Sequence, residues 1–597
     1  MLSRLETLRI AAFGIALVSL LVVGPATAQE PDGIDLVFDG NCLWPDIAGG
    51  SPYNTDSGGA SCPSGTFDTP KLVQVYYEHN AILDPSLVDP FNLADPDFSP
   101  TADSPVLCKD PVTGMDNMPD SLGVVLVSEI DPFFDTVSYV GALDYTGGVA
   151  VDDWTKGWTY HNYDGGQGRT DIPALPHVQY TLADSITVDT VWDGSQSVYE
   201  LYGRVQVTNG ATLTILPGTV ILGMPGTDAF LAIQRDAKVI ANGTRELPII
   251  FTSGADYTQG LQTPGDWGGI VTHGRAIANC GSGGAVPGCN STATGQDCLS
   301  EGDEGPAGQG AWFGGSVEDD SSGSFEYCRI EYSGREIAPN NELNCWTWNA
   351  VGRETHYDYL QAFGGTDDGF EWFGGNAQVK HLVSIANQDD NLDWQMGFRG
   401  KVQYAVVLQV ADFGGDKGIE SDNNEFNFEC PGRSNPMLSN LTLIGSDAGA
   451  DGIHHRRGTA ALVVNSVITH WPSNCYRVQH TETFDNCMGQ NPLPMFDCGV
   501  IGVADAGAPS IPGFVIAAAP NPVFASSTFT FNLTDETDVR LSVYDATGRL
   551  VDQVFQGHLG AGNHALDWTP GSVTSGVYYY KAVAGSQQAS GKLLVLD

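Results

Sequence analysis

The chain has 597 residues, about four times the length of a common single domain, so several domains or one long repetitive domain are expected. It carries 26 basic and 72 acidic residues, a net charge of −46, which excludes nucleic acid and anionic membrane surfaces as favoured partners because both attract cationic proteins. Hydrophobic residues make up 42% and aromatic residues 10%, enough for a sizeable core, so the chain is not a disordered acidic tail.

Residues 1–28 have the three parts of a secretory signal peptide. Arg4 and Arg9 form a basic start, residues 10–23 an apolar run, and Ala26-Thr27-Ala28 a cleavage site. The apolar run is short for a membrane span, so we expect an exported mature chain without a transmembrane helix; a membrane anchor is the alternative. Twelve cysteines, an even number, fit an oxidising compartment and predict disulfides of undetermined pairing.

Residues 29–187 are rich in Pro, Asp and Gly and contain only short apolar runs. This composition predicts an irregular, loop-rich N-terminal region with short strands. Its aromatic residues, among them Phe133, Phe134, Trp154 and Trp158, are expected to form local core that fixes the loops to a larger body. A surface patch is the alternative.

Residues 188–503 consist of short alternating apolar runs separated by corners of Asn, Pro and Gly. One phrase recurs at 340–344, 367–371, 389–393, 416–420 and 450–454, with a second strand ahead of most repeats. A coil of this length buries its apolar face only against its neighbours, which predicts a parallel β-helix of stacked coils with two strands per coil.

The opening coils include the segments 211–221 (ATLTILPGTVI) and 248–253 (PIIFTS). Here the sequence resembles secreted bacterial right-handed parallel β-helix proteins of the pectate-lyase-like superfamily, over residues 190–500. The resemblance implies an all-β fold. It implies no single activity, because this fold hosts lyases, glycosidases, adhesins and surface proteins.

The repeated phrase places carboxylates on one face of successive coils. Each phrase turns at Gly369, Asn391, Gly418 or Gly452, residue types that tolerate a left-handed backbone. After the turn an apolar residue should point inward, so its neighbour points outward by alternation. The expected outward residues are Glu371, Asp393, Glu420 and His454, and the corner adds Asp367, Asp368, Asp389, Asp390, Asp416 and Asp451.

Stacked strands lie about 4.8 Å apart, and two unit charges at that spacing repel by about 3.5 kcal/mol at an effective dielectric of 20. The carboxylates of the corner are therefore expected to raise one another's pKa or to recruit a cation, and Ca²⁺, which takes six to eight oxygens, is the predicted cofactor. Asp367, Asp389, Asp393 and Asp416 are the predicted metal ligands, and Glu371, Glu420 and Arg456 are predicted to bind a further ligand. The alternative is a solvated polar corner whose Asp and Asn side chains cap turns.

A catalytic interpretation uses the same face. Asp368 or Glu371 with Asp390 or Asp393 would supply an acid and a base for glycoside cleavage, with His454 beside them. The protein would then be a hydrolase or lyase of acidic polysaccharides. However, the predicted β-helix region 188–503 lacks the Asn-Thr-Asp, Gly-His-Gly and Arg-Ile-Lys phrases of polygalacturonase-like enzymes. Trp372 and Trp394 share the parity of the inward residues, which predicts core packing rather than a sugar platform.

Residues 504–513 are a predicted linker, and residues 514–597 alternate as six or seven short strands, which predicts a small antiparallel immunoglobulin-like sandwich. The phrases at 520–522 (PNP), 543–549 (VYDATGR) and 575–580 (SGVYYY) resemble the C-terminal sorting domains of type IX secretion. The resemblance implies the type IX machinery as a partner and a location outside the cell or on its surface. A plain immunoglobulin-like accessory domain is the alternative.

Together these features predict an exported β-helix protein with a binding or structural role, whose acidic corner binds cations or a surface glycan. The competing hypothesis is the polysaccharide-degrading enzyme.

Overall fold

The computed structural model describes much of residues 84–161 and most of residues 174–483. The second range has gaps at 182–183, 256–261, 339–340 and 481 and within 281–310. The structure also describes short strands within 37–53, 81–82, 495–496 and 516–595. The predicted signal peptide and the predicted linker at 504–513 lie outside the described residues. The chain forms two compact units, Met1–Val500 and Ile501–Asp597, each with its own hydrophobic core.

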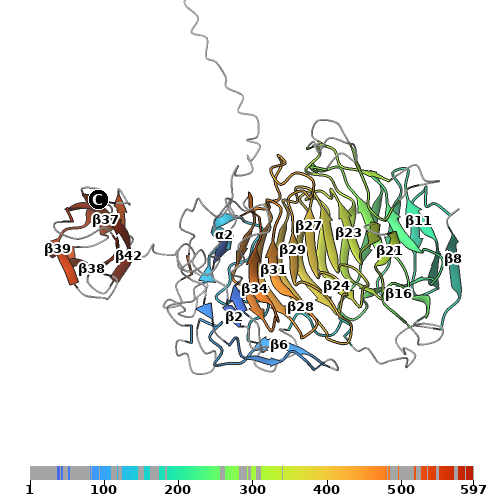
Figure 1. Ribbon diagram of the computed structural model, residues 1–597, viewed down its shortest axis with the longest axis horizontal. Coiled ribbons are helices and arrows are strands. Elements are labelled where there is room, and N and C mark those ends of the chain that lie inside the picture. The colour runs from blue at the N-terminus through green and yellow to red at the C-terminus, as the bar shows by residue number, and fades with distance from the viewer. Residues whose placement is uncertain are drawn as a thin grey trace, which may run out of the picture. The chain divides into compact units, whose positions relative to one another are not determined.

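The first unit is a parallel β-helix, as predicted, whose strands stack in register from one coil to the next (Figure 1). One of its sheets, sheet B, takes one short strand from each coil. In spatial order these are β11 (Arg204–Val207), β14 (Phe230–Ile233), β17 (Ile270–His273), β23 (Trp346–Asn349), β25 (Phe370–Phe373), β27 (Leu392–Gln395), β29 (Ile419–Ser421), β31 (Asp451–His455), β34 (Asn474–Val478) and β3 (Ser51–Tyr53).

Within the described residues, the second sheet, sheet A, has seventeen strands. In chain order they are β1 (Val37–Asp39), β2 (Cys42–Trp44), β4 (Ala81–Ile82), β8 (His177–Thr181), β9 (Thr190–Trp192), β10 (Val198–Tyr202), β12 (Thr212–Ile215), β13 (Val220–Gly223), β15 (Lys238–Asn242), β16 (Ile249–Ser253), β20 (Gly323–Glu331), β24 (His356–Phe363), β26 (Gln378–Ile385), β28 (Lys401–Leu408), β30 (Met437–Ile444), β32 (Leu462–Val464) and β33 (Val467–Thr469).

Sheet A bends along a line that crosses its long strands. The first half of β20 pairs with β15 and its second half with β16, and β30 pairs in the same way with β32 and β33. One left-handed residue lies at the bend of each long strand: Tyr327, Tyr359, His381, Tyr404 and Asn440, with φ between 47° and 64°. Each coil therefore has three straight segments rather than the predicted two strands, because one residue in this conformation turns the chain while pairing continues on both sides.

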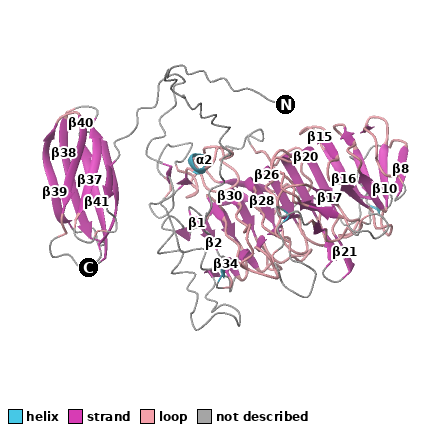
Figure 2. Cartoon of the chain, turned by 90° about the horizontal axis from the view of Figure 1, so that it is seen from above, coloured by secondary structure: helices cyan, strands magenta, loops and turns pink. Residues whose placement is uncertain are grey.

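The start of the chain joins the far end of the β-helix. Strands β1 and β2 pair in parallel with β32 and β33, β3 pairs with β34, and β4 pairs with β2. Figure 2 shows β1, β2 and β34 at one end of the β-helix and β8 and β10 at the other. The N-terminal region predicted to be irregular thus contributes strands to the last coil, so the edge of that coil is covered.

Residues 124–145 and 153–161, which we call the strap, cross the bend of sheet A. Side-chain amides of the β-helix bind the strap backbone: Gln361 binds Tyr160 and Gln403 binds Asp135. Trp154 packs edge-on against His381, with ring centroids 5.0 Å apart, and Trp158 is 1% exposed. The local aromatic core predicted for this region is confirmed.

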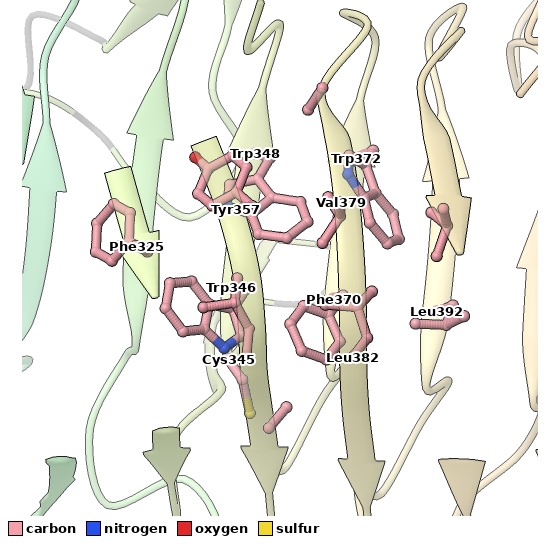
Figure 3. Close-up of a cluster of buried hydrophobic side chains, with 14 of the residues drawn as sticks. Phe325, Cys345, Trp346, Trp348, Tyr357, Phe370, Trp372, Val379, Leu382 and Leu392 are labelled. Carbon is pink, nitrogen blue, oxygen red and sulfur yellow. The ribbon is translucent and has the colours of Figure 1, made fainter. Parts of the chain in front are cut away.

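The interior between the sheets is a continuous stack of large side chains (Figure 3). Trp346 and Phe370 are parallel, with centroids 6.2 Å apart, and Trp348 and Trp372 follow at 5.0 Å. Trp372 and Trp394 are 1% and 0% exposed, so their predicted place in the core is confirmed.

Several shorter elements belong to neither sheet A nor sheet B. They are the hairpins β5 (Leu87–Asp89) with β6 (Asp97–Pro100), β18 (Cys298–Leu299) with β19 (Trp312–Phe313), and β21 (Arg335–Ala338) with β22 (Asn341–Leu343), the pair β7 (Val124–Val125) with β35 (Met495–Phe496), and the short helix α2 (Val127–Ile130). Disulfides join Cys280 to Cys298 and Cys289 to Cys430, as the even cysteine number led us to expect.

The second unit is the predicted small antiparallel sandwich. One sheet contains β36 (Ile516–Ala519), β37 (Ser527–Leu533) and β40 (Gly562–Trp568), and the other β38 (Thr537–Asp545), β39 (Leu550–Leu559), β41 (Gly576–Ala584) and β42 (Gln587–Val595). Phe529, Leu541 and Trp568 are among the residues that fill its core.

Candidate functional site

Sheet B brings the predicted acidic residues of successive coils into register. Glu371 on β25 pairs with Asp393 on β27, which pairs with Glu420 on β29, and Glu420 pairs with His454 on β31. The residues before them, Phe370, Leu392, Ile419 and Ile453, are 0% exposed in the core. The predicted alternation is therefore confirmed: these four polar side chains leave the β-helix interior on one face.

A second column of side chains stands at the turn that enters sheet B. Extending the strand register by two residues places Asn344, Asp368, Asp390, Lys417 and Asp451 at equivalent positions. Asn344 Oδ1 accepts a hydrogen bond from the Asp368 amide at 3.2 Å. Asp368 and Asp390 accept the amide of the equivalent residue in the next coil in the same way, so these three members of the column hold the turn of the coil that follows, as the turn-capping alternative suggested.

The alignment of the first repeat needs a correction. The sequence repeat predicts that 340–344 aligns with 367–371, which would make Asn341 equivalent to Asp368. In the structure β23 pairs Trp346 with Phe370, so Asn344 is the residue equivalent to Asp368. The reason is local: Asn341 belongs to β22, one strand of a hairpin inserted before the coil begins.

Carboxylate oxygens of both columns cluster closely enough to share a cation. Four groups of three carboxylates each have one oxygen per residue within 4.8 Å of the others. The groups are Asp367, Asp368 and Asp389; Asp368, Glu371 and Asp393; Asp389, Asp390 and Asp416; and Asp390, Asp393 and Glu420. We call these eight residues the carboxylate ladder. It includes all four predicted metal ligands, Asp367, Asp389, Asp393 and Asp416.

The ladder is more buried than the prediction of an exposed corner implied. Asp368 and Glu371 are each 6% exposed, Asp390 is 3% and Glu420 is 7%, whereas Asp389 stays exposed. These side chains leave the interior, yet they pack against one another and against polar neighbours. Glu371, for example, accepts hydrogen bonds from Asn344 Nδ2 at 2.5 Å and Gln395 Nε2 at 3.1 Å.

Burial and mutual repulsion determine the protonation of the ladder. Burial, followed by the charge of Asp367, raises the pKa of Asp368 well above its usual range. Burial, followed by the charge of Asp393, does the same for Glu371. The pKa values of Asp390 and Asp393 are raised for the same reasons, with Glu420 as the largest charged neighbour of each. Such shifts mark a site that a cation would stabilise.

Basic side chains compensate only one end of the ladder. Lys417 Nζ lies 2.9 Å from Glu420 Oε1 and 3.5 Å from Asp390 Oδ1, and it also contacts Asp416. Arg456 pairs with Glu420 and with Asp422, so the predicted ligand-binding residues Glu420 and Arg456 bind each other. Among the described residues, none of Asp367, Asp368, Glu371 and Asp393 forms an ion pair with a basic side chain.

Two buried ladder oxygens take no hydrogen bond from the described residues, and of these Glu420 Oε1 has Lys417 as an ion-pair partner whereas Asp393 Oδ1 does not. Oδ1 of Asp393 is shielded from solvent and takes no hydrogen bond from any described residue. Asp393 is also the residue shared by the two groups that contain Glu371 and Glu420. Together with Asp368 and Glu371, it supplies hard oxygen ligands of the kind Ca²⁺ prefers, and the amides of Asn344 and Gln395 lie beside them.

His454 lies at the end of the outward column and is 3% exposed. Its Nε2 is 3.0 Å from Gln479 Oε1. Burial, aided by the charge of Arg477, lowers the pKa of His454 to about 2 and keeps the ring neutral. A neutral buried imidazole is a poor general acid near neutral pH, and this does not favour the catalytic role considered for it.

Several residues of the site were not predicted from the sequence. Lys417 stood in the repeat phrase, where a base in an otherwise acidic column was a usable signal. Asn344 was hidden by the hairpin before it. Glu301, whose charge contributes to the raised pKa of Glu371, comes from an insertion with no repeat pattern, so no sequence signal placed it there.

Two family models match the chain. One, described as a pectate-lyase-like β-helix domain, matches residues 184–503, and the other, described as a secretion system C-terminal sorting domain, matches residues 518–596. A search of curated proteins gave no match. No helix within the described ranges has the length and hydropathy needed to cross a membrane. The chain therefore belongs to the family of pectate-lyase-like β-helix domains and carries a type IX secretion sorting domain that directs it to the cell surface or the extracellular space.

Proposed function

We propose that this secreted β-helix protein binds a divalent cation, Ca²⁺, through its carboxylate ladder, and that it serves outside the cell as a binding or structural module rather than as an enzyme. The observation that carries the proposal is the triplet of Asp368, Glu371 and Asp393, whose oxygens lie within 4.8 Å of one another without a basic partner among the described residues. We call it the first triplet.

The electrostatics of the first triplet favour a cation. Two unit charges 4.8 Å apart repel by about 3.5 kcal/mol at an effective dielectric of 20, and each of the three carboxylates faces two others. Protonation relieves this repulsion at acid pH. Near neutral pH a divalent cation relieves it more completely, because it also gives the unpartnered Asp393 Oδ1 a ligand contact.

The polysaccharide-degrading alternative has less support. A catalytic acid and base must meet the scissile bond, yet Asp368 and Asp390 are 6% and 3% exposed. Each also holds the backbone amide of the following coil at hydrogen-bond distance. Residues with that structural task and so little exposure are better suited to holding an ion than to reaching a polymer.

The test is a calcium titration of the full mature protein after treatment with EDTA. We expect a calorimetric binding heat and a rise in unfolding temperature, with stabilisation of about 2.7 kcal/mol at a free Ca²⁺ concentration 100 times Kd. Glu371→Gln, which keeps the shape and removes one charge, should weaken binding. No heat and no thermal shift would refute the proposal, and reducing-sugar release from acidic polysaccharides would favour the enzyme instead.

A further inference from the structure

The carboxylate ladder contains two triplets related by one coil. One coil further along sheet B, the residues at the positions of Asp368, Glu371 and Asp393 are Asp390, Asp393 and Glu420, respectively. The second triplet is therefore Asp390, Asp393 and Glu420, and its oxygens also lie within 4.8 Å of one another. By geometry alone these two of the ladder's four carboxylate groups offer equivalent cation sites.

The two triplets differ in what lies between their carboxylates. Lys417 occupies the position that Asp390 has in the preceding coil and Asp451 has in the following coil. Its ammonium group is 2.9 Å from Glu420 and 3.5 Å from Asp390, two of the three members of the second triplet. Lys417 is 9% exposed, so this ammonium is largely withdrawn from water.

We propose that Lys417 acts as a tethered cation that fills the second triplet and so restricts divalent-cation binding to the first. This inference rests on the proposed cation-binding function of the ladder. The first triplet has no equivalent base, because the residue at its corresponding position is Asp390, itself an acid. The fixed ammonium thus sets both the position and the number of bound ions.

The charges around Lys417 support this division. The Lys417 ammonium also contacts Asp416, so the carboxylates of Asp390, Asp416 and Glu420 hold it between them. A second divalent ion would have to approach this ammonium closely, and repulsion at such distances amounts to several kcal/mol in a partly buried site. Arg456, paired with Glu420, adds to the same barrier.

The main test counts calcium ions in two variants of the full mature protein. Lys417→Met removes the ammonium and keeps the length of the side chain, whereas Lys417→Arg keeps a positive charge and serves as the matched control. Native mass spectrometry and calorimetry with Ca²⁺ should give one ion for the wild type, one for Lys417→Arg and two for Lys417→Met. The second ion should bind more weakly because Arg456 remains.

A second pair of variants tests the division without altering Lys417. Asp368→Asn and Asp390→Asn both retain an oxygen that can accept the amide of the next coil. We expect Asp368→Asn, which removes a carboxylate from the first triplet, to weaken binding of the single Ca²⁺ by at least the roughly tenfold that loss of an outer-sphere metal partner costs. Asp390→Asn, which removes a carboxylate from the second triplet, should weaken it less.

The outcomes separate the two proposals. Binding of one ion by both the wild type and Lys417→Met would overturn the role of Lys417 and leave the calcium proposal standing. Two ions in the wild type, or equal losses in Asp368→Asn and Asp390→Asn, would also overturn it. Absence of binding in every variant, with normal thermal unfolding, would refute the calcium proposal itself.

Discussion

Asp368 Oδ1 accepts a hydrogen bond from the backbone amide of Asp390 at 2.9 Å. One coil later Asp390 Oδ1 accepts the amide of Lys417 at 2.7 Å. The chain of side-chain-to-amide contacts stops there, because a Lys side chain has no acceptor. The residue that ends this structural chain is also the one that places an ammonium group in the carboxylate ladder.

The two interpretations of the acidic corner are therefore compatible. One oxygen of Asp368 holds the turn of the next coil, as in a capped polar corner, and its position is fixed by that contact. A carboxylate has a second oxygen and further lone pairs, which a cation can use. Ligands held in this way are preorganised, so less ordering entropy opposes ion binding.

The stabilisation by calcium should depend on pH with a definite sign. The pKa values of Asp368 and Glu371 are raised above their unfolded values of about 3.9 and 4.3, so near pH 5 the folded ladder keeps protons that Ca²⁺ must displace. The difference in unfolding temperature between Ca²⁺ and EDTA should therefore grow from pH 5 to pH 8. Differential scanning fluorimetry measures this directly.

The prediction concerns the difference in unfolding temperature between Ca²⁺ and EDTA, not the unfolding temperature in either condition alone. His454, whose pKa is lowered to about 2, makes folding more favourable as pH rises through about 6.5, the opposite sign to the ladder, and it does so with or without calcium. Its contribution cancels in the subtraction. A calcium effect that shrinks toward pH 8 would contradict binding by ionised ladder carboxylates.

Particular residues show how much the sequence could predict. The spacing of the repeat located the β-helix, and alternation placed Glu371, Asp393 and Glu420 on one face in the correct register. The burial of that face was not predictable, because it depends on Asn344, whose alignment is hidden by the hairpin before it, and on Glu301, which comes from an insertion without periodicity. The joining of β1 and β2 to β32 and β33 brings together segments more than 400 residues apart, beyond any local pattern.

A buried ion pair in the early coils should be important for stability. Arg204 donates two hydrogen bonds to Asp303, at 2.6 and 2.9 Å, and His273 Nε2 lies 3.1 Å from the same carboxylate. Asp303→Asn leaves Arg204 as an uncompensated buried charge, so we expect a loss of about 3–5 kcal/mol in the free energy of unfolding. Denaturant titration of the full chain provides the measurement.

The control for Asp303→Asn is Asp236→Asn. Asp236 also pairs with an arginine, Arg275, but its side chain is 58% exposed, so the loss should be under about 1 kcal/mol. Burial would raise the pKa of Asp303, but the hydrogen bonds from His273 and Arg204 outweigh it and lower the pKa. The loss of unfolding free energy in Asp303→Asn should thus be full above about pH 4 and smaller in stronger acid. Equal losses in Asp303→Asn and Asp236→Asn would contradict this prediction.

The strap should depend on the amide of Asn465. Asn465 Oδ1 accepts the Val125 amide at 2.6 Å, and Nδ2 donates to the Val125 carbonyl at 2.8 Å. Asn465→Ala leaves both buried backbone groups without these partners and places Ala at φ 54°, a left-handed conformation that Asn tolerates better than Ala. We expect a loss of about 3 kcal/mol and faster hydrogen exchange at Val125.

Asn465→Gly separates the two causes. Glycine accepts the left-handed backbone but cannot bind the strap, so the variant should recover stability relative to Asn465→Ala while hydrogen exchange at Val125 stays fast. Slow exchange in both variants would show that the side-chain amide does not hold this part of the strap.

Trp372 should matter for stability and not for carbohydrate binding. It is 1% exposed and stacks on Phe398, with ring centroids 5.0 Å apart, so Trp372→Ala leaves a cavity in the core and should cost about 3–5 kcal/mol. Trp312, 45% exposed, is the matched control, and Trp312→Ala should change stability by less than about 0.5 kcal/mol. Thermal unfolding and a polysaccharide pull-down are measured on both variants. Normal stability with loss of polysaccharide binding in Trp372→Ala would instead make this residue part of a sugar platform.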